Sequence, residues 1–340
     1  MMEHKNNKPV IIWLLSGCLL IFLMVVVGGI TRLTNSGLSM VDWNPIMGFI
    51  PPLSDLDWNE AFDKYKQYPE YQMVNYHFTL SEFKSIFFWE YFHRLIGRVI
   101  GMVFLIPFIY FIITKKLSKK LKQQSLVLFA MGGLQGFIGW WMVKSGLVKD
   151  PDVSHFRLAT HLITAFLTFT YTFWVALGLM YNDEKTANFK SLRTILFFVF
   201  GVTIVQIIYG AFVAGLNAGF IMNTFPKMGN QWINDAVFAL TPLYKNFTEG
   251  LAGVQFVHRY LAYLVAGLIL LFVLKSQNFK LSVRQKSASR LMLYVVFIQF
   301  LLGVFTLLYA VPIWLGVVHQ VGAFLLLTAI VNALHAFRKS

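Results

Sequence analysis

The sequence predicts an all-α polytopic membrane protein whose eight transmembrane helices form two similar four-helix bundles. Three observations favour this fold class. Hydrophobic residues make up 57% of the 340 residues and charged residues only 13%, with a mean hydropathy of +0.62, which is outside the usual composition of a soluble domain. Eight apolar stretches reach the roughly 20 residues that a spanning helix needs. Basic residues gather in alternate connections between these stretches.

The apolar stretches predict the helices in order along the chain. They lie at residues 10–30, 87–113, 125–143, 158–181, 193–215, 253–274, 291–311 and 315–334. The first follows a start without the Arg-rich and Ser-rich pattern of a transit peptide or a small-residue cleavage site, so we expect it to remain as an anchor. A long connection, 32–86, separates the first two. Its length and its content of Trp, Tyr and Pro indicate a function.

The distribution of charge predicts the topology. Most of the 29 basic residues lie in the N-terminus, the C-terminus and the connections 114–124, 182–193 and 275–290, and these segments hold only three acidic residues. The positive-inside rule places them in the cytoplasm, so both termini are expected there and 32–86 outside. The net charge of +14 then follows from topology, and we expect membrane lipid rather than nucleic acid as a partner. A bacterial inner membrane is favoured over a mitochondrial one.

Weak internal similarity divides the chain into halves at 1–182 and 183–340. The first stretch runs into GGITRLTNSGLSM and the fifth into GAFVAGLNAGFIM. The second stretch opens with FHR at 92–94, and the sixth opens with VHR at 257–259. Duplication of this kind also occurs in transporters, so it does not identify a function by itself.

Four histidines near the starts of apolar stretches are the first functional candidates: His93, His161, His258 and His319. An ionisable side chain inside a membrane is costly and is usually kept for a ligand, an ion or a proton. Each is followed four residues later by Gly or Ala, which leaves an open surface on the same helix face. One pair in each half is the arrangement that bis-histidine haem requires. The alternative is that these are ordinary packing grooves and hydrogen-bonded histidines.

The other histidines and the cysteine are weaker candidates. His4, His77, His155 and His335 are expected to be solvated or structural. The single cysteine, Cys18, excludes an intramolecular disulfide and a CxxCH haem attachment, and a buried packing role is its default.

Four arginines are candidate partners of haem propionates, because a guanidinium offers a fork to a carboxylate. They are Arg94, Arg98, Arg157 and Arg259. Interfacial snorkelling explains the same positions equally well.

One difference between the halves points to catalysis. Glu90 lies three residues before His93, on the same helix face, whereas Gln255 occupies the matching place before His258. A carboxyl group one turn from a haem ligand can exchange protons or stabilise positive charge on a substrate, and glutamine cannot ionise. The alternative is that Glu90 only pairs with Arg94.

Five segments resemble the signatures of the haem A synthase family, in that family's order. They are GGITRLTNSGLSMVDWNPIMGFIPP at 28–52, EFKSIFFWEYFHRLIGRVIG at 82–101, RLATHL at 157–162, VQFVHRYLAY at 254–263 and VVHQVGAF at 317–324. The resemblance spans the chain from the first to the last predicted helix. Many bacterial members have a cysteine pair in the first outer loop, and this loop has none, as in the alphaproteobacterial and mitochondrial branch.

The resemblance implies an oxidoreductase that converts the C8 methyl group of haem O to the formyl group of haem A, with oxygen derived from water, for aa3-type cytochrome c oxidase. It implies that His93 and His161 hold the substrate haem, that His258 and His319 ligate the iron of haem b, and that Glu90 is the catalytic carboxylate. It also implies haem O synthase (protohaem farnesyltransferase) and oxidase assembly factors as partners. The electron partner stays open, and a homo-oligomer is compatible with the sequence.

Two other classes of protein share some of these features. A dihaem cytochrome b that carries electrons from a quinol would have the same four histidines, but it needs neither Glu90 nor a long first loop. A transporter would use the histidines as proton or substrate sites and would be colourless. The pigment of the purified protein therefore separates the three hypotheses.

Overall fold

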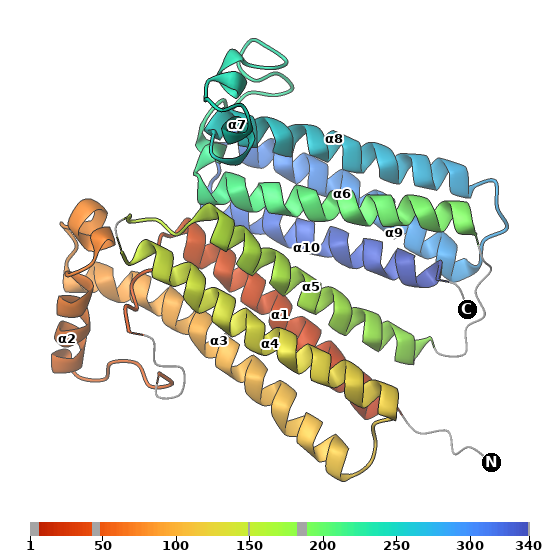
Figure 1. The fold of residues 1–340 in the computed structure, drawn as a ribbon, viewed down its shortest axis with the longest axis horizontal. Coiled ribbons are helices and arrows are strands. Elements are labelled where there is room, and N and C mark those ends of the chain that lie inside the picture. Colours follow the sequence, from red (N-terminus) through yellow and green to blue (C-terminus); the bar gives the residue numbers. More distant parts are fainter. Residues whose placement is uncertain (1–6, 43–47, 149, 182–188, 339–340) are drawn as a thin grey trace. The chain divides into compact units, whose positions relative to one another are not determined.

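The computed structural model describes residues 7–42, 48–148, 150–181 and 189–338. Eight helices in this part of the chain are long and apolar enough to cross a membrane (Figure 1). They are α1 (Lys8–Leu33), α3 (Leu80–Ile113), α4 (Lys119–Gly146), α5 (His155–Met180), α6 (Lys190–Gly215), α8 (Leu251–Ser276), α9 (Val283–Leu308) and α10 (Ile313–Ala336). The eight helices predicted from hydropathy are thus confirmed.

Local sequence signals explain where these helices differ from the predicted ranges. Helix α3 begins at Leu80, well before the predicted residue 87, because Thr79 and Glu82 form a capping box at its N-terminus. Helix α9 ends at Leu308 rather than at 311. The next residues, Ala310 and Val311, have φ angles of 52° and 54°, a left-handed conformation that does not continue an α-helix.

The Cα positions form two compact units, Met1–Thr172 and Phe173–Ser340, and the boundary lies within α5. In the first unit α3 packs against α1 and α4. In the second unit α6 packs against α8 and α10, while α9 packs against α8 and α10. The apolar core of the second unit includes Leu196, Ile269, Met292 and Ile330, all of which are fully buried.

The long connection after α1 contains a folded outer segment. Its helix α2 (Asp55–Tyr65) has a capping box from Ser54 and is followed by a π-helical turn, η1 (Tyr71–Asn75). Five buried side chains join this segment to the first turns of α3: Phe62, Tyr65, Phe83, Ile86 and Phe87. Their rings stack and meet edge to face, with Phe62 and Phe83 centroids 5.0 Å apart. Burial of these aromatic rings holds α2 on α3.

The second unit has a smaller outer segment between α6 and α8. It contains two short 3-10 helices, η2 (Ala218–Phe220) and η3 (Asp235–Phe238), and the short helix α7 (Tyr244–Thr248). Met228, Val237 and Ala252 form its buried core. Each unit therefore carries a folded segment beside the helix that bears its first candidate histidine.

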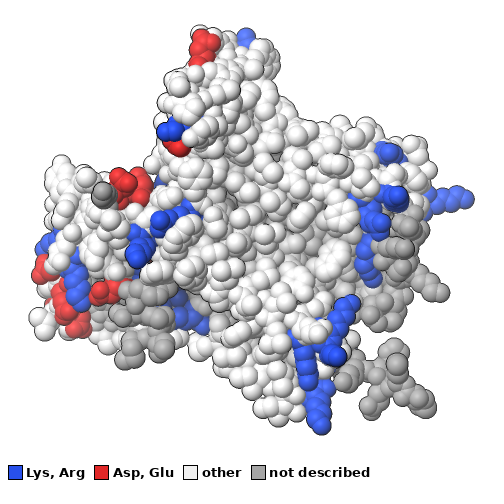
Figure 2. Space-filling model, in the orientation of Figure 1, with Lys and Arg blue, Asp and Glu red and all other residues white. Residues whose placement is uncertain are grey.

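Charged side chains separate along the helices of each unit. Acidic and basic side chains lie together on the outer segments, whereas the opposite helix ends show lysine and arginine without acidic side chains among the described residues (Figure 2). Within the first outer segment Lys64 pairs with Asp42 and Glu60 at 3.1 and 3.0 Å. This separation has the sign that the positive-inside rule requires.

Candidate functional site

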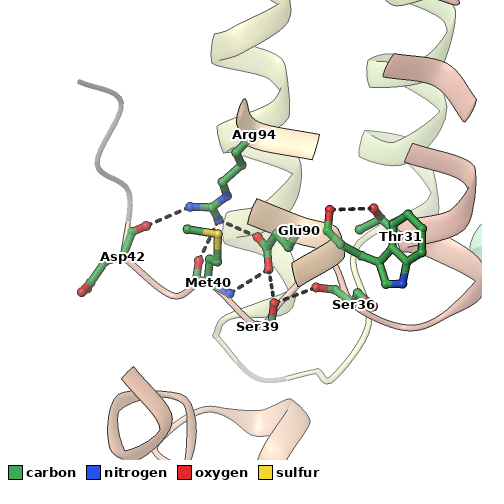
Figure 3. Close-up of polar contacts among 8 residues, drawn as sticks. Thr31, Ser36, Ser39, Met40, Asp42, Glu90 and Arg94 are labelled. Carbon is green, nitrogen blue, oxygen red and sulfur yellow. Dashed lines mark hydrogen bonds and ion pairs between the residues drawn. The ribbon is translucent and has the colours of Figure 1, made fainter. Parts of the chain in front are cut away.

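Glu90 is buried in the first unit, with 3% of its surface exposed. The hydroxyl of Ser39 lies 2.8 Å from its Oε2, the backbone N–H of Met40 donates to the same oxygen at 2.7 Å, and Arg94 donates to Oε1 at 2.6 Å (Figure 3). These three donors satisfy both oxygens of the buried carboxyl group. The ion pair between Glu90 and Arg94, which was the alternative explanation for Glu90, is therefore present. Glu90 also accepts hydrogen bonds from Ser39 and Met40.

Arg94 ties the chain after α1 to α3. Its guanidinium donates to the backbone carbonyls of Asp42 and Met40 at 2.8 and 2.7 Å (Figure 3). The chain reaches this position through a sharp turn after α1, where Asn35 has a φ of 48°. Asparagine is one of the few residues that adopt this left-handed conformation readily.

The second unit has the same arrangement with the opposite hydrogen-bond polarity. Gln255 donates to the backbone carbonyls of Ala218 and Ile221, and Arg259 donates to its side-chain oxygen at 3.0 Å. Glu90 accepts hydrogen bonds from the chain that follows α1, whereas Gln255 donates them to the chain that follows α6. At this matched position the first unit has a carboxyl group and the second unit has an amide.

The remaining arginine candidates also have partners in the protein. Arg259 donates to the carbonyls of Thr224 and Met222. Arg157 donates to the carbonyl of Trp141 at 2.8 Å. The guanidinium of Arg98 lies over the ring of Phe49, 5.4 Å from its centroid.

Each of the four histidines lies against a glycine of a neighbouring helix. A Cβ built on the glycine would lie between 2.9 and 3.1 Å from the nearest ring atom, closer than real Cβ atoms normally come. The pairs are Gly28 of α1 with His93 of α3, Gly139 of α4 with His161 of α5, Gly210 of α6 with His258 of α8, and Gly303 of α9 with His319 of α10. Only glycine lets the two backbones approach closely enough for the ring to occupy this position.

Within the second unit the two imidazole rings have the separation that a shared iron requires. The ring centroids of His258 and His319 are 6.4 Å apart, and the rings are inclined by 86°. Two imidazoles on one metal, with metal–nitrogen bonds of about 2 Å, have centroids about 6 Å apart. The residues present therefore fit a bis-histidine haem. His93 and His161 are likewise close enough to interact electrostatically within the first unit.

Two glutamines orient one histidine in each unit. The Nε2 atom of Gln135 lies 3.1 Å from Nδ1 of His161, and that of Gln299 lies 3.2 Å from Nδ1 of His319. Each amide also donates to the backbone carbonyl of the same histidine. These glutamines and the four glycines were not among the candidates that the sequence indicates. The spacing Gln-xxx-Gly, which recurs in α4, α6 and α9, was the available signal.

The outer segment adds a second buried carboxyl group that the sequence analysis missed. Glu70 is 6% exposed and accepts a hydrogen bond from the hydroxyl of Tyr65 at 2.9 Å. Burial raises the pKa of Glu70 from its ordinary 4.5 to about 8, with Glu90 and Asp152 adding to the rise and Arg32 opposing it. Burial also raises the pKa of the Tyr65 hydroxyl. A cavity of about 250 Å³ beside this segment is lined by Ser39, Arg94 and Arg98, among others.

The weaker candidates have structural surroundings. His335 is buried, and its Nδ1 lies 2.9 Å from both Arg284 and Arg338. His77 is exposed, His155 begins α5, and His4 lies outside the described residues. Cys18 is buried within α1 and is a free thiol.

Comparison with known proteins gives one consistent result. A family model described as cytochrome oxidase assembly protein, COX15-CtaA, matches residues 11–331. Heme A synthase of Flavobacterium psychrophilum is 56% identical over 98% of this chain and 100% of its own length. Heme A synthases of Nitrosospira multiformis and Wolbachia pipientis are 46% and 43% identical, over 98% and 94% of this chain and 94% and 90% of their own lengths.

Proposed function

This chain belongs to the COX15-CtaA family of cytochrome oxidase assembly proteins, and from that membership we propose that it is an oxidoreductase that converts haem O to haem A. The substrate's C8 methyl group becomes a formyl group. Two successive hydroxylations, with oxygen from water, give a gem-diol that loses one water molecule. Each hydroxylation removes two electrons and two protons from the substrate.

The position of Glu90 is the observation that carries this proposal. It lies one helical turn before His93, and three donors contact its two side-chain oxygens. A carboxylate stabilises the positive charge that develops as electrons leave the methyl carbon, and it can accept a proton from the attacking water. The second unit, where Gln255 replaces the carboxylate, lacks both abilities.

We assign His93 and His161 to the substrate haem and His258 and His319 to a resident haem b. The glycine contacts at all four rings and the 6.4 Å spacing in the second unit support this assignment. When bound, haem b supplies one-electron transfer from the substrate to a redox partner outside this chain. Arg94, Arg98, Arg157 and Arg259 stay candidate partners for propionates, in addition to the carbonyl groups and rings that they contact.

We further propose that the two units are repeats and that both termini face the cytoplasm of a bacterium. Matching glycines, histidines and arginine-to-carbonyl contacts in the two units support the repeat. The basic connections support the topology. The absence of cysteine from residues 32–86 supports placement in the branch without the loop cysteine pair. Haem O synthase would supply the substrate, and cytochrome c oxidase would receive the product.

Replacement of Glu90 tests the proposed role of the carboxylate. The variant Glu90→Ala, expressed with haem O synthase, should keep its haem spectra while the yield of haem A falls. The matched control is Gln255→Ala, which removes the corresponding side chain from the second unit and should leave the first unit's chemistry in place. Near-normal haem A from Glu90→Ala would remove Glu90 from the mechanism.

Replacement of His258 or His319 tests the assignment of haem b. Either variant should lose the low-spin spectrum of the resident haem, because a bis-histidine iron needs both imidazoles. Survival of that spectrum in both variants would show that the second-unit assignment is wrong.

A further inference from the structure

Three of the four histidines have a glutamine one helical turn before the glycine that contacts the ring. The pairs are Gln135 with Gly139, Gln206 with Gly210, and Gln299 with Gly303. Helix α1 differs, because Met24 occupies the place four residues before Gly28. Residues four apart share a helix face, so each of these side chains lies on the face that its histidine contacts.

In the second unit, the amide of Gln206 and the ring of His258 each have one buried polar atom without a hydrogen-bond partner among the described residues. These atoms are Oε1 of Gln206 and Nδ1 of His258. The two residues are neighbours, since the backbone carbonyl of Gln206 lies beside the ring and Gly210 contacts its Cε1 and Nδ1 edge. Buried acceptors and donors are rarely left unpaired.

If His258 binds iron, its tautomer would allow the two unpaired atoms to form a hydrogen bond with each other. An imidazole that binds iron through Nε2 carries its proton on Nδ1, and this N–H needs an acceptor. A rotamer change of Gln206 would present Oε1 to that proton. Oε1 has no hydrogen bond to give up in the described part of the chain, and the backbone carbonyl of Gln206 beside the ring is the competing acceptor.

His93 in the first unit has no such acceptor. Met24 reaches toward α3, where its Cε would lie 3.4 Å from a Cβ on Gly97, and a thioether is only a weak acceptor. No hydrogen bond to the ring of His93 is found within the described residues. Its ring also turns a different edge, Nε2 and Cδ2, toward Gly28, whereas the other three histidines turn Cε1 and Nδ1 toward their glycines.

We propose that Gln206 is a positioning residue that fixes His258 as a permanent haem ligand, and that Met24 at the matching place leaves His93 as the ligand that lets the product haem go. This inference rests on the proposed function. Release would free the imidazole of His93 from the haem iron, with the lone pair kept by the ring and no electron transferred. His161 stays in place for the next substrate, with its backbone carbonyl bonded to the amide of Gln135.

The physical basis is the second hydrogen bond of a metal-bound imidazole. An acceptor at Nδ1 fixes the tautomer and the ring orientation and makes Nε2 a stronger donor, and its loss typically weakens metal binding by about 10-fold to 100-fold. A protein that keeps one haem and exchanges the other needs this difference between its two sites. Met24 and Gln206, at matching positions in the two units, give the two sites this difference in hydrogen bonding.

An exchange of the two side chains tests the proposal. The full chain is purified with both haems, and haem loss to an excess of apomyoglobin is followed by absorbance. We expect Gln206→Met to speed the loss of the second-unit haem by about 10-fold or more. Met24→Gln should slow the loss of the first-unit haem. The control Met24→Leu changes the side chain without adding an acceptor and should leave both rates unchanged.

The reduction potential of the second-unit haem separates a positioning role from a merely structural one. An electron-richer imidazole stabilises ferric iron, so Gln206→Met should raise the midpoint potential and Gln206→Glu, whose carboxylate is a stronger acceptor, should lower it. The Glu variant keeps the proposal testable if the Met variant does not fold. Unchanged haem loss and an unchanged midpoint potential in the Gln206 variants would overturn the proposal. The backbone carbonyl of Gln206 would then be a sufficient acceptor for the Nδ1 proton of His258.

This outcome differs from a failure of the proposed function. A wild-type protein without a bis-histidine haem in the second unit would refute the function itself. If the wild-type protein has that haem and the Gln206 variants bind it equally well, only the role of Gln206 is refuted.

Discussion

Replacement of Glu70 by Gln should make the protein more stable at neutral and alkaline pH. Burial raises the pKa of this carboxyl group from 4.5 to about 8, so the folded protein keeps a proton that the unfolded chain loses. Stability therefore falls as the pH rises from about 4.5 to 8, by about 1.4 kcal/mol per pH unit. At pH 7 the penalty is roughly 3 kcal/mol, and Gln at position 70 removes it.

The structure also predicts that the substitution does little harm of its own. Gln keeps a side-chain oxygen that can accept the hydrogen bond from Tyr65, which is 2.9 Å long in the wild type. Below about pH 4.5 both proteins carry a neutral side chain at position 70, so their stabilities should converge there. The difference between variant and wild type should thus grow with pH and then level off above about pH 8.

Thermal unfolding followed by tryptophan fluorescence measures this difference across pH 5 to 9. The matched control is Glu60→Gln, because Glu60 lies on the same outer segment with 66% of its side chain exposed. A gap between Glu70→Gln and wild type that stays constant with pH would refute the reasoning. So would a wild type that gains stability relative to the variant as the pH rises.

Two further substitutions test the packing of the site. Gly303→Ala places a Cβ 2.9 Å from Cε1 of His319, so the ring must move and the low-spin haem spectrum should weaken; Gly267→Ala, which meets no atom within 4 Å, should not change it. Tyr65→Phe removes the hydroxyl that donates to Glu70 and leaves a buried acceptor unpaired, which should lower stability by about 1 to 3 kcal/mol in thermal or denaturant unfolding. An unchanged spectrum in the first case, or unchanged stability in the second, would contradict the structure.

Helix positions could be predicted from the sequence because hydropathy depends on local composition. All eight spanning helices were found, and the errors lay at their ends, where the capping box of Thr79 and the left-handed residues after Leu308 decide the limits. The outer helix α2 lies within a connection for which the sequence predicts no helix. Its helical pattern is short, and its stability comes from packing on α3 rather than from its own residues.

The candidate site was only partly accessible to sequence reasoning. His93 and Glu90 stand out because ionisable residues are rare in apolar stretches. Glycine is common in such stretches, so nothing marked Gly28 as a ring contact until the helices were packed. The burial of Glu70 depends on how the outer segment folds over α3, which no local pattern encodes.

The haem extracted from the purified protein shows directly whether this chain converts haem O to haem A. The chain is expressed with haem O synthase in cells that make no haem A of their own, and the pigments are separated by chromatography and identified by mass. We expect haem A, with its formyl group, together with haem b. Haem O and haem b without haem A would contradict it, and a colourless protein would contradict every assignment of the four histidines.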